Sequence, residues 1–508
     1  MLTIDGSSLR IEDVVRVARN GEPVRVGEGV TERMSGSRAV VERINVEGAA
    51  VYGVTTGFGA LADRAIAPAD RSALQRAVVL SHAAGVGEAL DAEVVRGAAL
   101  LRARTLAAGM SGVRADLVAA LLRLLTSGVV PWVPEHGSLG ASGDLAPLAH
   151  IAAVLLGEGF VRGDDGTRIA ARDALSARGI DPIEVGPKEG LALINGTDAL
   201  TAILALATHD VEGLLSAVDC ACAMSAEALL ATTVAYREPV IALRPSPGQA
   251  ASAANLRELL RDSPMVASHR ESHHAVQDAY SLRCAPQVHG AARDAVAFVR
   301  TTVDHELASI VDNPVVLDGE LVSAGNFHAQ AMAYAADLLA SVCADVASIS
   351  ERRVDRLLDP ARSRGLPAFL SRDPGLNNGF MIAQYSAAAL VATLRASATP
   401  LAVLSASTSA GQEDHVSMAY EAALRTRRSV AALRSVLAVE IVCAAQALEL
   451  RAPLRPAPAT AALLASVREV VPPLSDDRVI APDLEVLAGW LREQRWRDAI
   501  RDVVTNPR

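Results

Sequence analysis

Five long stretches rich in alanine and leucine constrain the fold of this chain more than any other feature of its sequence. Helices this apolar are poorly solvated on their own, so they must pack against one another in a bundle. Aromatic residues make up only 3% of the chain although hydrophobic residues make up 51%, which favours closely packed helices of Ala, Leu and Val over strands. We therefore predict a mainly α fold with a long helical bundle. The stretches lie at about residues 198–236, 288–310, 326–357, 376–396 and 415–449.

The first part of the chain is expected to form a smaller domain of mixed structure. It holds shorter segments separated by glycine-containing turns, and an Asp-Asp-Gly run within residues 160–169 predicts a β-hairpin. We predict an N-terminal domain at residues 1–198, which carries the glycine-rich loops described below. The long-helix bundle and the C-terminal helices then occupy residues 199–508.

Acidic residues interrupt the long apolar stretches. Asp219 and Glu227 break one stretch, and Asp337 and Asp345 break another. None of the apolar stretches therefore reaches the ~20 uninterrupted apolar residues of a membrane-spanning helix. The first residues of the chain lack the basic and apolar regions of a signal peptide. We expect a soluble, cytoplasmic protein that does not bind a membrane. The net charge of −10 without a basic run also argues against a nucleic-acid partner.

Cysteine, histidine and lysine residues restrict the possible cofactors. Five cysteines, an odd number, form neither a disulfide framework nor a paired metal-ligand spacing. His269, His273 and His274 lie close together, but without an acidic partner at ligand spacing they favour a polar loop. Lys188 is the only lysine available for the Schiff base that pyridoxal phosphate requires. We predict neither a metal ion nor pyridoxal phosphate.

The most specific chemistry lies in a loop of very small residues, which reads Gly-Ser-Leu-Gly-Ala-Ser-Gly-Asp-Leu-Ala-Pro-Leu-Ala-His from residue 137 to residue 150. In a tight turn the amide nitrogen of Gly143 can attack the carbonyl carbon of Ala141, because no bulky side chain blocks the approach. Loss of water closes a five-membered ring, and elimination of the Ser142 hydroxyl leaves an electrophilic methylidene group. Asp144 is a good N-cap for the helix that follows, whose dipole favours electron flow into the ring.

The tripeptide alone is also typical of an ordinary glycine-rich loop. The whole run at residues 137–150, however, resembles the signature of the histidine and aromatic amino acid ammonia-lyases, and the resemblance extends from about Tyr52 to Met418. In that family the tripeptide forms 4-methylideneimidazol-5-one, so the resemblance implies this prosthetic group here. It also implies an amino acid substrate and a homotetramer whose active sites combine residues from several subunits.

Three further segments resemble catalytic motifs of this family. The glycine-rich loop at residues 52–59 resembles the mobile tyrosine loop, and Tyr52 falls on its catalytic tyrosine, although Thr55 stands where Asn is more common. Asn195, by itself a turn residue before glycine, matches the asparagine beside the ring and the substrate. Glu413, whose acidic run by itself reads as compensation of a helix dipole, matches the catalytic glutamate.

Besides Asn195, the substrate-binding candidates are His82, Gln277, Arg283 and Phe327, and Tyr280 is a further catalytic candidate. His82, by itself a histidine at a helix end, falls where the family faces the substrate side chain, and the Ser-His pair resembles the histidine lyases. Arg283 offers the planar fork that suits a carboxylate, and its segment, which includes Gln277 and Tyr280, closely matches a family motif. Phe327 resembles the aromatic residue near the ring, although it could equally be a core residue.

The resemblance implies non-oxidative elimination of ammonia from an aromatic amino acid, and the polar candidates favour L-histidine, which becomes trans-urocanate. Arg283 would hold the carboxylate, and Tyr52 or Glu413 would remove the β-proton. Tyr280 and Asn195 would orient the ring and the substrate. A tyrosine that acts as a base near neutral pH needs a lowered pKa, which helix N-termini aimed at the site would provide.

Several alternatives stay open. Tyrosine or phenylalanine is another possible substrate, and a 2,3-aminomutase needs the same ring, tyrosine and arginine as a lyase. A catalytically inactive helical scaffold would keep an unmodified Ala-Ser-Gly. Departures from the histidine lyases leave the chemistry intact but put the substrate in doubt, because residues around a pocket shape it. They lie at Asp198, Gln330, 393–395, Thr399 and Gly411.

Overall fold

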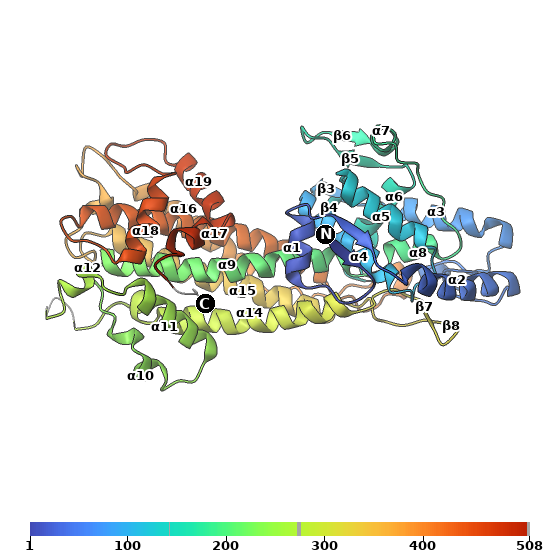
Figure 1. Cartoon of the computed structure of the whole chain (residues 1–508), viewed down its shortest axis with the longest axis horizontal. Helices are drawn as coiled ribbons and strands as arrows, with labels where there is room; N and C mark the ends of the chain where they lie inside the picture. Colours follow the sequence, from blue (N-terminus) through green and yellow to red (C-terminus); the bar gives the residue numbers. More distant parts are fainter. Residues whose placement is uncertain (142, 272–275, 505–508) are drawn as a thin grey trace. The chain divides into compact units, whose positions relative to one another are not determined.

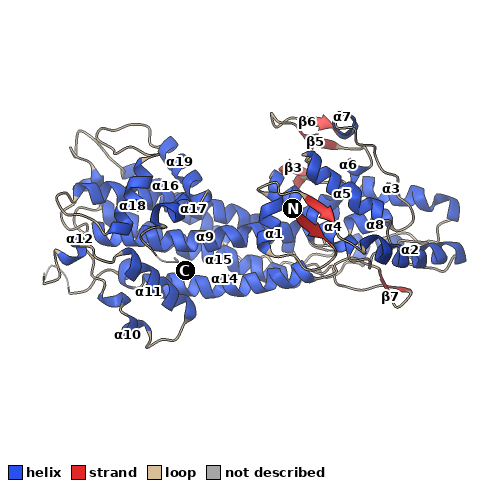
Figure 2. Ribbon diagram, in the orientation of Figure 1, coloured by secondary structure: helices blue, strands red, loops and turns tan. Residues whose placement is uncertain are grey.

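The computed structural model of this chain describes residues 1–141, 143–271 and 276–504. Its regular structure is mainly helical with a few short strands, so the predicted fold class is confirmed (Figure 2). Each of the five apolar stretches forms a long helix, as their period and composition predicted. These helices are α9 (Asp198–Ala228), α14 (Ala285–Ala308), α15 (Gln330–Leu358), α16 (Met381–Ser397) and α17 (Ala419–Leu450) (Figure 1).

The ends of these helices differ from the prediction by several residues. α9 ends at Ala228 instead of near residue 236, because Leu230 has a left-handed backbone with φ of 49°. α17 begins only after Met418, which is also left-handed with φ of 57°. A left-handed residue cannot continue a right-handed helix, and the apolar pattern carries no signal for such a residue.

The chain divides into two compact units, each built of three chain segments. Unit 1 contains residues 1–209, 300–337 and 400–426, and unit 2 contains residues 210–299, 338–399 and 427–508. The predicted boundary after residue 198 separates two consecutive domains, whereas these units interleave along the chain. That boundary stays a prediction.

The strands that the structure describes pair two by two and form no larger sheet. The predicted hairpin at residues 160–169 is confirmed by the antiparallel pairing of β5 with β6. β1 pairs with β2 in parallel, and β3 with β4 and β7 with β8 pair antiparallel. The strands are β1 (Leu2–Ile4), β2 (Val24–Val26), β3 (Val86–Ala89), β4 (Pro134–His136), β5 (Phe160–Arg162), β6 (Arg168–Ala170), β7 (Val315–Leu317) and β8 (Glu320–Val322).

Three short helices of unit 1 position the loops of interest. α3, α6 and α8 pack on one another, and the chain leaves or enters each of them at a predicted functional segment: His82 ends α3, the Ala-Ser-Gly loop precedes α6, and Asn195 follows α8. α4 packs against α1 and α5. The helices of unit 1 are α1 (Ile11–Ala18), α2 (Val30–Glu47), α3 (Arg71–His82), α4 (Ala92–Ala107), α5 (Ala115–Ser127), α6 (Leu145–Leu155), α7 (Ala171–Ser176) and α8 (Glu189–Ile194), with the 3₁₀ turns η1 (Gly59–Leu61), η2 (Pro68–Asp70) and η5 (Ser409–Gly411).

Unit 2 adds shorter helices around its parts of the long ones. α11 packs on α10 and α18, and α20 packs on α18 and α19, where Trp490 and Trp496 are buried. These elements are η3 (Val234–Tyr236), α10 (Glu238–Ile241), α11 (Pro247–Leu259), α12 (Pro264–Ala267), α13 (Tyr280–Arg283), η4 (Ala368–Leu370), α18 (Pro458–Arg468), α19 (Ala481–Arg492) and α20 (Arg495–Ile500).

By length and composition alone, α9, α15 and α17 are apolar enough to cross a membrane. Their most apolar windows are, however, 83%, 67% and 78% buried inside the protein. Packing within the bundle therefore accounts for their apolar character.

Candidate active site

Gly143 and Asp144, which follow Ser142, contact the segment after Asn195. Gly143 has φ of 73° and forms a parallel bridge with Gly196, and the next amide, that of Asp144, donates to the Gly196 carbonyl at 2.6 Å. A Cβ on Gly143 would collide with that same carbonyl. Both the backbone conformation and the space therefore require glycine. Ser142 itself lies outside the described residues.

The sequence predicted that the Asp144 side chain caps α6. In the structure it does not. It occupies the N-cap position, but its Oδ2 accepts a hydrogen bond from the amide of Leu200, at 2.8 Å in the first turn of α9. Asp144 is fully buried, and burial raises its pKa well above the usual value. The carboxyl group thus joins the loop to α9.

Hydrogen bonds fix both the side chain and the backbone carbonyl of Asn195. Its side-chain Nδ2 donates to the carbonyl of Asn313 at 2.8 Å, and its own carbonyl accepts from Arg102 Nη1 at 2.6 Å. Its Oδ1, by contrast, is buried and has no hydrogen-bond partner among the described residues. A buried acceptor left open in this way is suited to a ligand or a prosthetic group.

A buried ion pair supports the Asn195 contact. The amine of Lys188 lies 2.8 Å from Asp312 Oδ2, and both side chains are fully buried. Asp312 Oδ1 in turn accepts from the amide of Asn313 at 2.8 Å. Burial lowers the pKa of Lys188, although the charge of Asp312 opposes this shift. The only lysine of the chain therefore fixes the backbone to which Asn195 is bonded.

The loop that carries Tyr52 is fixed by Gln75, which is fully buried in α3. Gln75 Nε2 donates to the Gly53 carbonyl at 2.9 Å, and its Oε1 accepts from the Leu191 amide at 3.0 Å. Thr55, where the family more often has Asn, is buried and bonds within its own loop, where its hydroxyl accepts from the Val51 amide at 2.8 Å. One glutamine thus connects the Tyr52 loop to α8.

Tyr52, His82, Asn195 and Glu413 line one cavity of about 150 Å³ in unit 1. The structure therefore brings together four candidates that are far apart in the sequence. Glu413 is oriented by Thr408, whose hydroxyl donates to its Oε2 at 2.6 Å. The other residues that line the cavity are Phe58, Gly59, Val78, Leu145, Leu191 and Ser409.

The electrostatics of Tyr52 differ from the expectation. Burial raises its pKa, the amide of Gly59, which donates to the phenol oxygen at 3.2 Å, lowers it, and the nearby charge of Glu413 raises it further. The net shift is upward, so the expected lowering is wrong for this arrangement of groups. Burial also lowers the pKa of His82, which favours a neutral imidazole in the cavity.

The remaining candidates lie elsewhere, and their roles stay predictions. Phe327 is half-buried in the turn before α15 and is not among the residues that line this cavity. Gln277, Tyr280 and Arg283 belong to unit 2. Gln277 lines a separate cavity of about 360 Å³ there, and the Arg283 guanidinium lies 4.5 Å from the centre of the Tyr280 ring. His273 and His274 lie outside the described residues.

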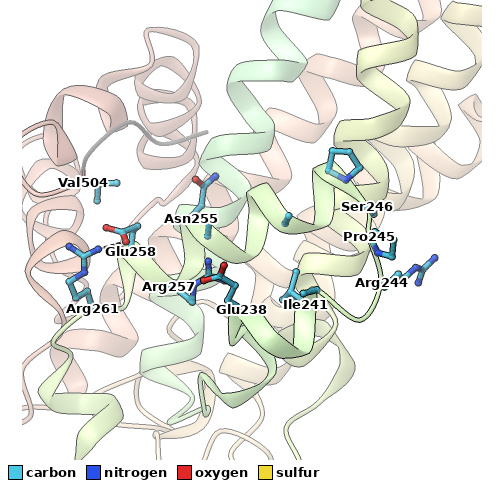
Figure 3. A pocket seen from close by; sticks show the side chains of 14 residues that line it. Glu238, Ile241, Arg244, Pro245, Ser246, Asn255, Arg257, Glu258, Arg261 and Val504 are labelled. Carbon is cyan, nitrogen blue, oxygen red and sulfur yellow. Dashed lines mark hydrogen bonds and ion pairs between the residues drawn. The ribbon is translucent and has the colours of Figure 1, made fainter.

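A larger cavity of about 830 Å³ lies beside α10 and α11 in unit 2 (Figure 3). Figure 3 shows charged side chains of both signs around it, including Glu238, Arg257 and Arg261. It contains none of the predicted site residues. The largest of these three cavities is therefore not the one that the candidate residues line.

Sequence reasoning missed Gln75, Arg102 and the partner of Lys188. A polar residue at a core position of an apolar helix is the one signal that could have marked the first two. Nothing in the sequence pairs Lys188 with Asp312, because the contact joins distant segments.

Comparisons with known proteins show which family and which solved structures this chain resembles. A family model described as aromatic amino acid lyase matches residues 9–469. A histidine ammonia-lyase of Streptomyces avermitilis is 46% identical over 495 residues, which cover 97% of this chain and 96% of that protein. The crystal structure of a tyrosine aminomutase from Streptomyces globisporus has a TM-score of 0.94 and 35% identity and covers 100% of both chains. A histidine ammonia-lyase structure from Trypanosoma cruzi has a TM-score of 0.91 and 37% identity, and covers 99% of this chain and 96% of that one.

Proposed function

The chain belongs to the aromatic amino acid lyase family and is an ammonia-lyase, and we propose that it converts L-histidine to trans-urocanate and ammonia. The family inferred from the loop at residues 137–150 is thereby confirmed. The observation that supports histidine is the presence of His82 and Glu413 in one cavity with Tyr52 and Asn195. Polar groups of this kind suit an imidazole better than a phenyl ring.

The residues present fit the prosthetic group 4-methylideneimidazol-5-one. Gly143 adopts a turn that only glycine tolerates, and Asn195 leaves a buried oxygen open at the cavity. We propose that Ala141, Ser142 and Gly143 form this ring. Once formed, this ring would supply an electrophile for the amino group of the substrate.

The chain's own side chains then bind and deprotonate the substrate. Neutral His82 can exchange a hydrogen bond with the substrate imidazole. Arg283 would hold the carboxylate through two parallel hydrogen bonds, and Tyr280, Asn195 and Phe327 would hold and orient the prosthetic group and the substrate. Tyr52 or Glu413 removes the β-proton.

The raised pKa of Tyr52 bears on that last step. A protonated phenol cannot accept a proton, so Tyr52 serves as the base only where positive charge in the assembled site offsets burial and Glu413. Replacing Tyr52 by Phe and Glu413 by Gln separates the two candidates. We expect the base variant to lose several orders of magnitude in kcat and the other variant to lose less.

Arg283, Tyr280 and Gln277 reach the cavity from another copy of the chain in this proposal, which makes the protein a homotetramer with shared sites. The protein acts on a small amino acid in the cytoplasm. Its family identity supports this proposal.

The decisive experiment incubates the purified protein separately with histidine, tyrosine and phenylalanine and identifies all products by mass spectrometry. Urocanate from histidine alone is the expected result. A second candidate function, a tyrosine 2,3-aminomutase, is favoured by the structural match to such an enzyme. Accumulation of a β-amino acid, with histidine untouched, would replace the first proposal by the second.

Intact mass tests the ring and with it the inactive-scaffold alternative. Two dehydrations remove about 36 Da from the chain. We expect the wild-type protein to show this deficit and Ser142→Ala to retain full mass for its sequence and to be inactive. An unmodified wild-type chain would contradict the proposal.

A further inference from the structure

Arg283, the candidate for binding the substrate carboxylate, lies on a helix that is too short to be stabilised by its own hydrogen bonds. α13 contains only four residues, Tyr280–Arg283, so most of its carbonyls lack partners within the helix. Two of these carbonyls are bonded from beneath instead. The hydroxyl of Tyr236 donates to the Leu282 carbonyl at 2.9 Å, and Arg353 Nη1 donates to the Ser281 carbonyl at 3.3 Å. Both donors are fully buried.

Arg353 is itself fixed by Glu440. Its Nε and Nη2 donate to the two carboxylate oxygens at 2.6 and 2.9 Å, and both side chains are fully buried. The remaining positions on Glu440 are taken by the hydroxyls of Ser225 and Ser350, at 2.8 and 2.6 Å. The guanidinium therefore has one orientation.

A second buried carboxylate extends this arrangement. His289 Nε2 lies 3.3 Å from Arg353 Nη1, and His289 Nδ1 lies 2.8 Å from Asp219 Oδ1. Burial lowers the pKa of His289, although its bond to Asp219 opposes the shift. A neutral ring that donates to Asp219 accepts from Arg353. Arg293 also donates to Asp219 Oδ2, at 2.7 Å, and Ser252 and Asn255 donate to the same carboxylate.

The inner side of α13 is hydrogen-bonded to buried side chains, whereas its outer side is exposed. Tyr280 is 71% exposed, and the Arg283 guanidinium stacks on its ring. Arg283 Nε is buried and has no hydrogen-bond partner within the described part of the chain. Arg283 thus keeps a donor available for a ligand while its backbone is anchored.

We infer that Tyr236 and Arg353 are positioning residues, which fix α13 so that Arg283 meets the substrate carboxylate. This inference rests on the proposed function, in which Arg283 binds that carboxylate. Stability alone does not explain the arrangement, because apolar side chains of similar volume commonly stabilise a core as well as a buried ion pair does. The Arg353 guanidinium and the Tyr236 hydroxyl specify instead where the Ser281 and Leu282 carbonyls lie.

Tyr236→Phe is the mildest test, because it removes one hydroxyl and keeps the ring. The Leu282 carbonyl then keeps only the Cys284 amide as a donor and loses its bond to the core, so α13 shifts. We expect KM for the amino acid to rise roughly tenfold, the size of one lost buried hydrogen bond, with kcat changed less. Gln446→Met is the matched control, since Gln446 also anchors a backbone segment, at Leu474, but not α13. It should lower the melting temperature and leave KM unchanged.

A double-mutant cycle with Arg283→Ala decides between positioning and general destabilisation. If Tyr236 acts through Arg283, Tyr236→Phe has little further effect on KM once Arg283 is removed. Additive effects, or an unchanged KM in Tyr236→Phe, overturn the inference.

Amide hydrogen exchange separates this inference from the proposed function. Faster exchange at residues 282–284 in Tyr236→Phe, but not in Gln446→Met, is expected whatever the substrate is. Unchanged exchange there overturns the anchoring role. Failure of the wild-type protein to release urocanate overturns the proposed function instead.

Discussion

A single methyl group at Gly143 would fill the space in which Gly143 approaches Gly196. The left-handed backbone alone costs an alanine about 1–2 kcal/mol, and the added Cβ also collides with the Gly196 carbonyl. We expect Gly143→Ala to fold less stably and to keep the mass of an unmodified chain. Intact mass and thermal unfolding measure both effects.

Gly166→Ala provides the matched control at the same scale. Gly166 has a similar φ of 81° in the β5–β6 turn, but a Cβ there meets no atom within 4 Å. It should lose comparable backbone stability and still carry the ring. Ring formation in Gly143→Ala equal to that in Gly166→Ala would show that the close approach to Gly196 is unnecessary.

At the scale of the elements, a buried ion pair joins two segments that lie far apart in the sequence. Replacing Lys188 by Met leaves the Asp312 carboxylate buried without its partner, which costs roughly 3–5 kcal/mol. The Asn313 carbonyl that orients Asn195 should then move, so kcat falls as well. Urea unfolding and steady-state kinetics measure the two losses. Adding Asp312→Asn removes the uncompensated charge and should restore most of the stability; a double variant as unstable as the single one would refute this explanation.

The buried imidazole of His289 makes the bundle sensitive to acid. Its pKa is lowered in the folded protein, so below the unfolded value of ~6.5 the unfolded chain binds more protons. The free energy of unfolding is therefore complete above that pH and falls as the pH drops through it. Asp219 does not contribute in this window: although burial alone would raise its pKa, the hydrogen bond from His289 and the charge of Arg293 lower it to about 2.

We expect His289→Gln to unfold more easily at pH 8 but to lose less stability than the wild type between pH 7 and pH 5. Chemical denaturation across that range measures the slope. His82 and His150, whose pKa values burial also lowers, keep part of the slope in the variant. An unchanged slope would exclude His289 as a source of the acid sensitivity.

Helices and motifs were predictable from the sequence, whereas their supports were not. The Ala/Leu stretches gave α9, α14, α15, α16 and α17, because apolar period and composition are local properties. Family motifs supplied Tyr52, His82, Asn195 and Glu413, which share one cavity. Gln75, Lys188 and Tyr236 act through contacts with distant backbone, and no local pattern encodes such contacts. The raised pKa of Tyr52 could not be predicted from the sequence either, because it depends on the burial of the side chain.

At the scale of the whole molecule, α16 presents apolar side chains that a monomer would leave in water. Ile382 and Tyr385 lie three residues apart on one helix face and are 57% and 63% exposed. Such a patch is typical of a subunit interface, in keeping with the proposed homotetramer. We expect Ile382→Glu with Tyr385→Glu to yield a smaller, inactive species by light scattering.

Val479→Glu is the control for added charge, because Val479 is 78% exposed in a loop outside the described helices. It should leave both the oligomeric state, measured by light scattering, and the activity unchanged. A wild-type protein that is monomeric and active at micromolar concentration would contradict the tetramer.

The turn around Gly143 also sets the order of events during biosynthesis. The same loop is bonded to residues made much later: the Met418 amide donates to the Leu139 carbonyl at 2.9 Å, and the Ser417 hydroxyl donates to the Gly140 carbonyl at 3.1 Å. The constraint that closes the proposed ring is therefore complete only after the ribosome has released most of the polypeptide. In the proposed reaction, self-modification follows folding instead of accompanying translation, so the ring would serve as a chemical record that a given molecule has reached its native state.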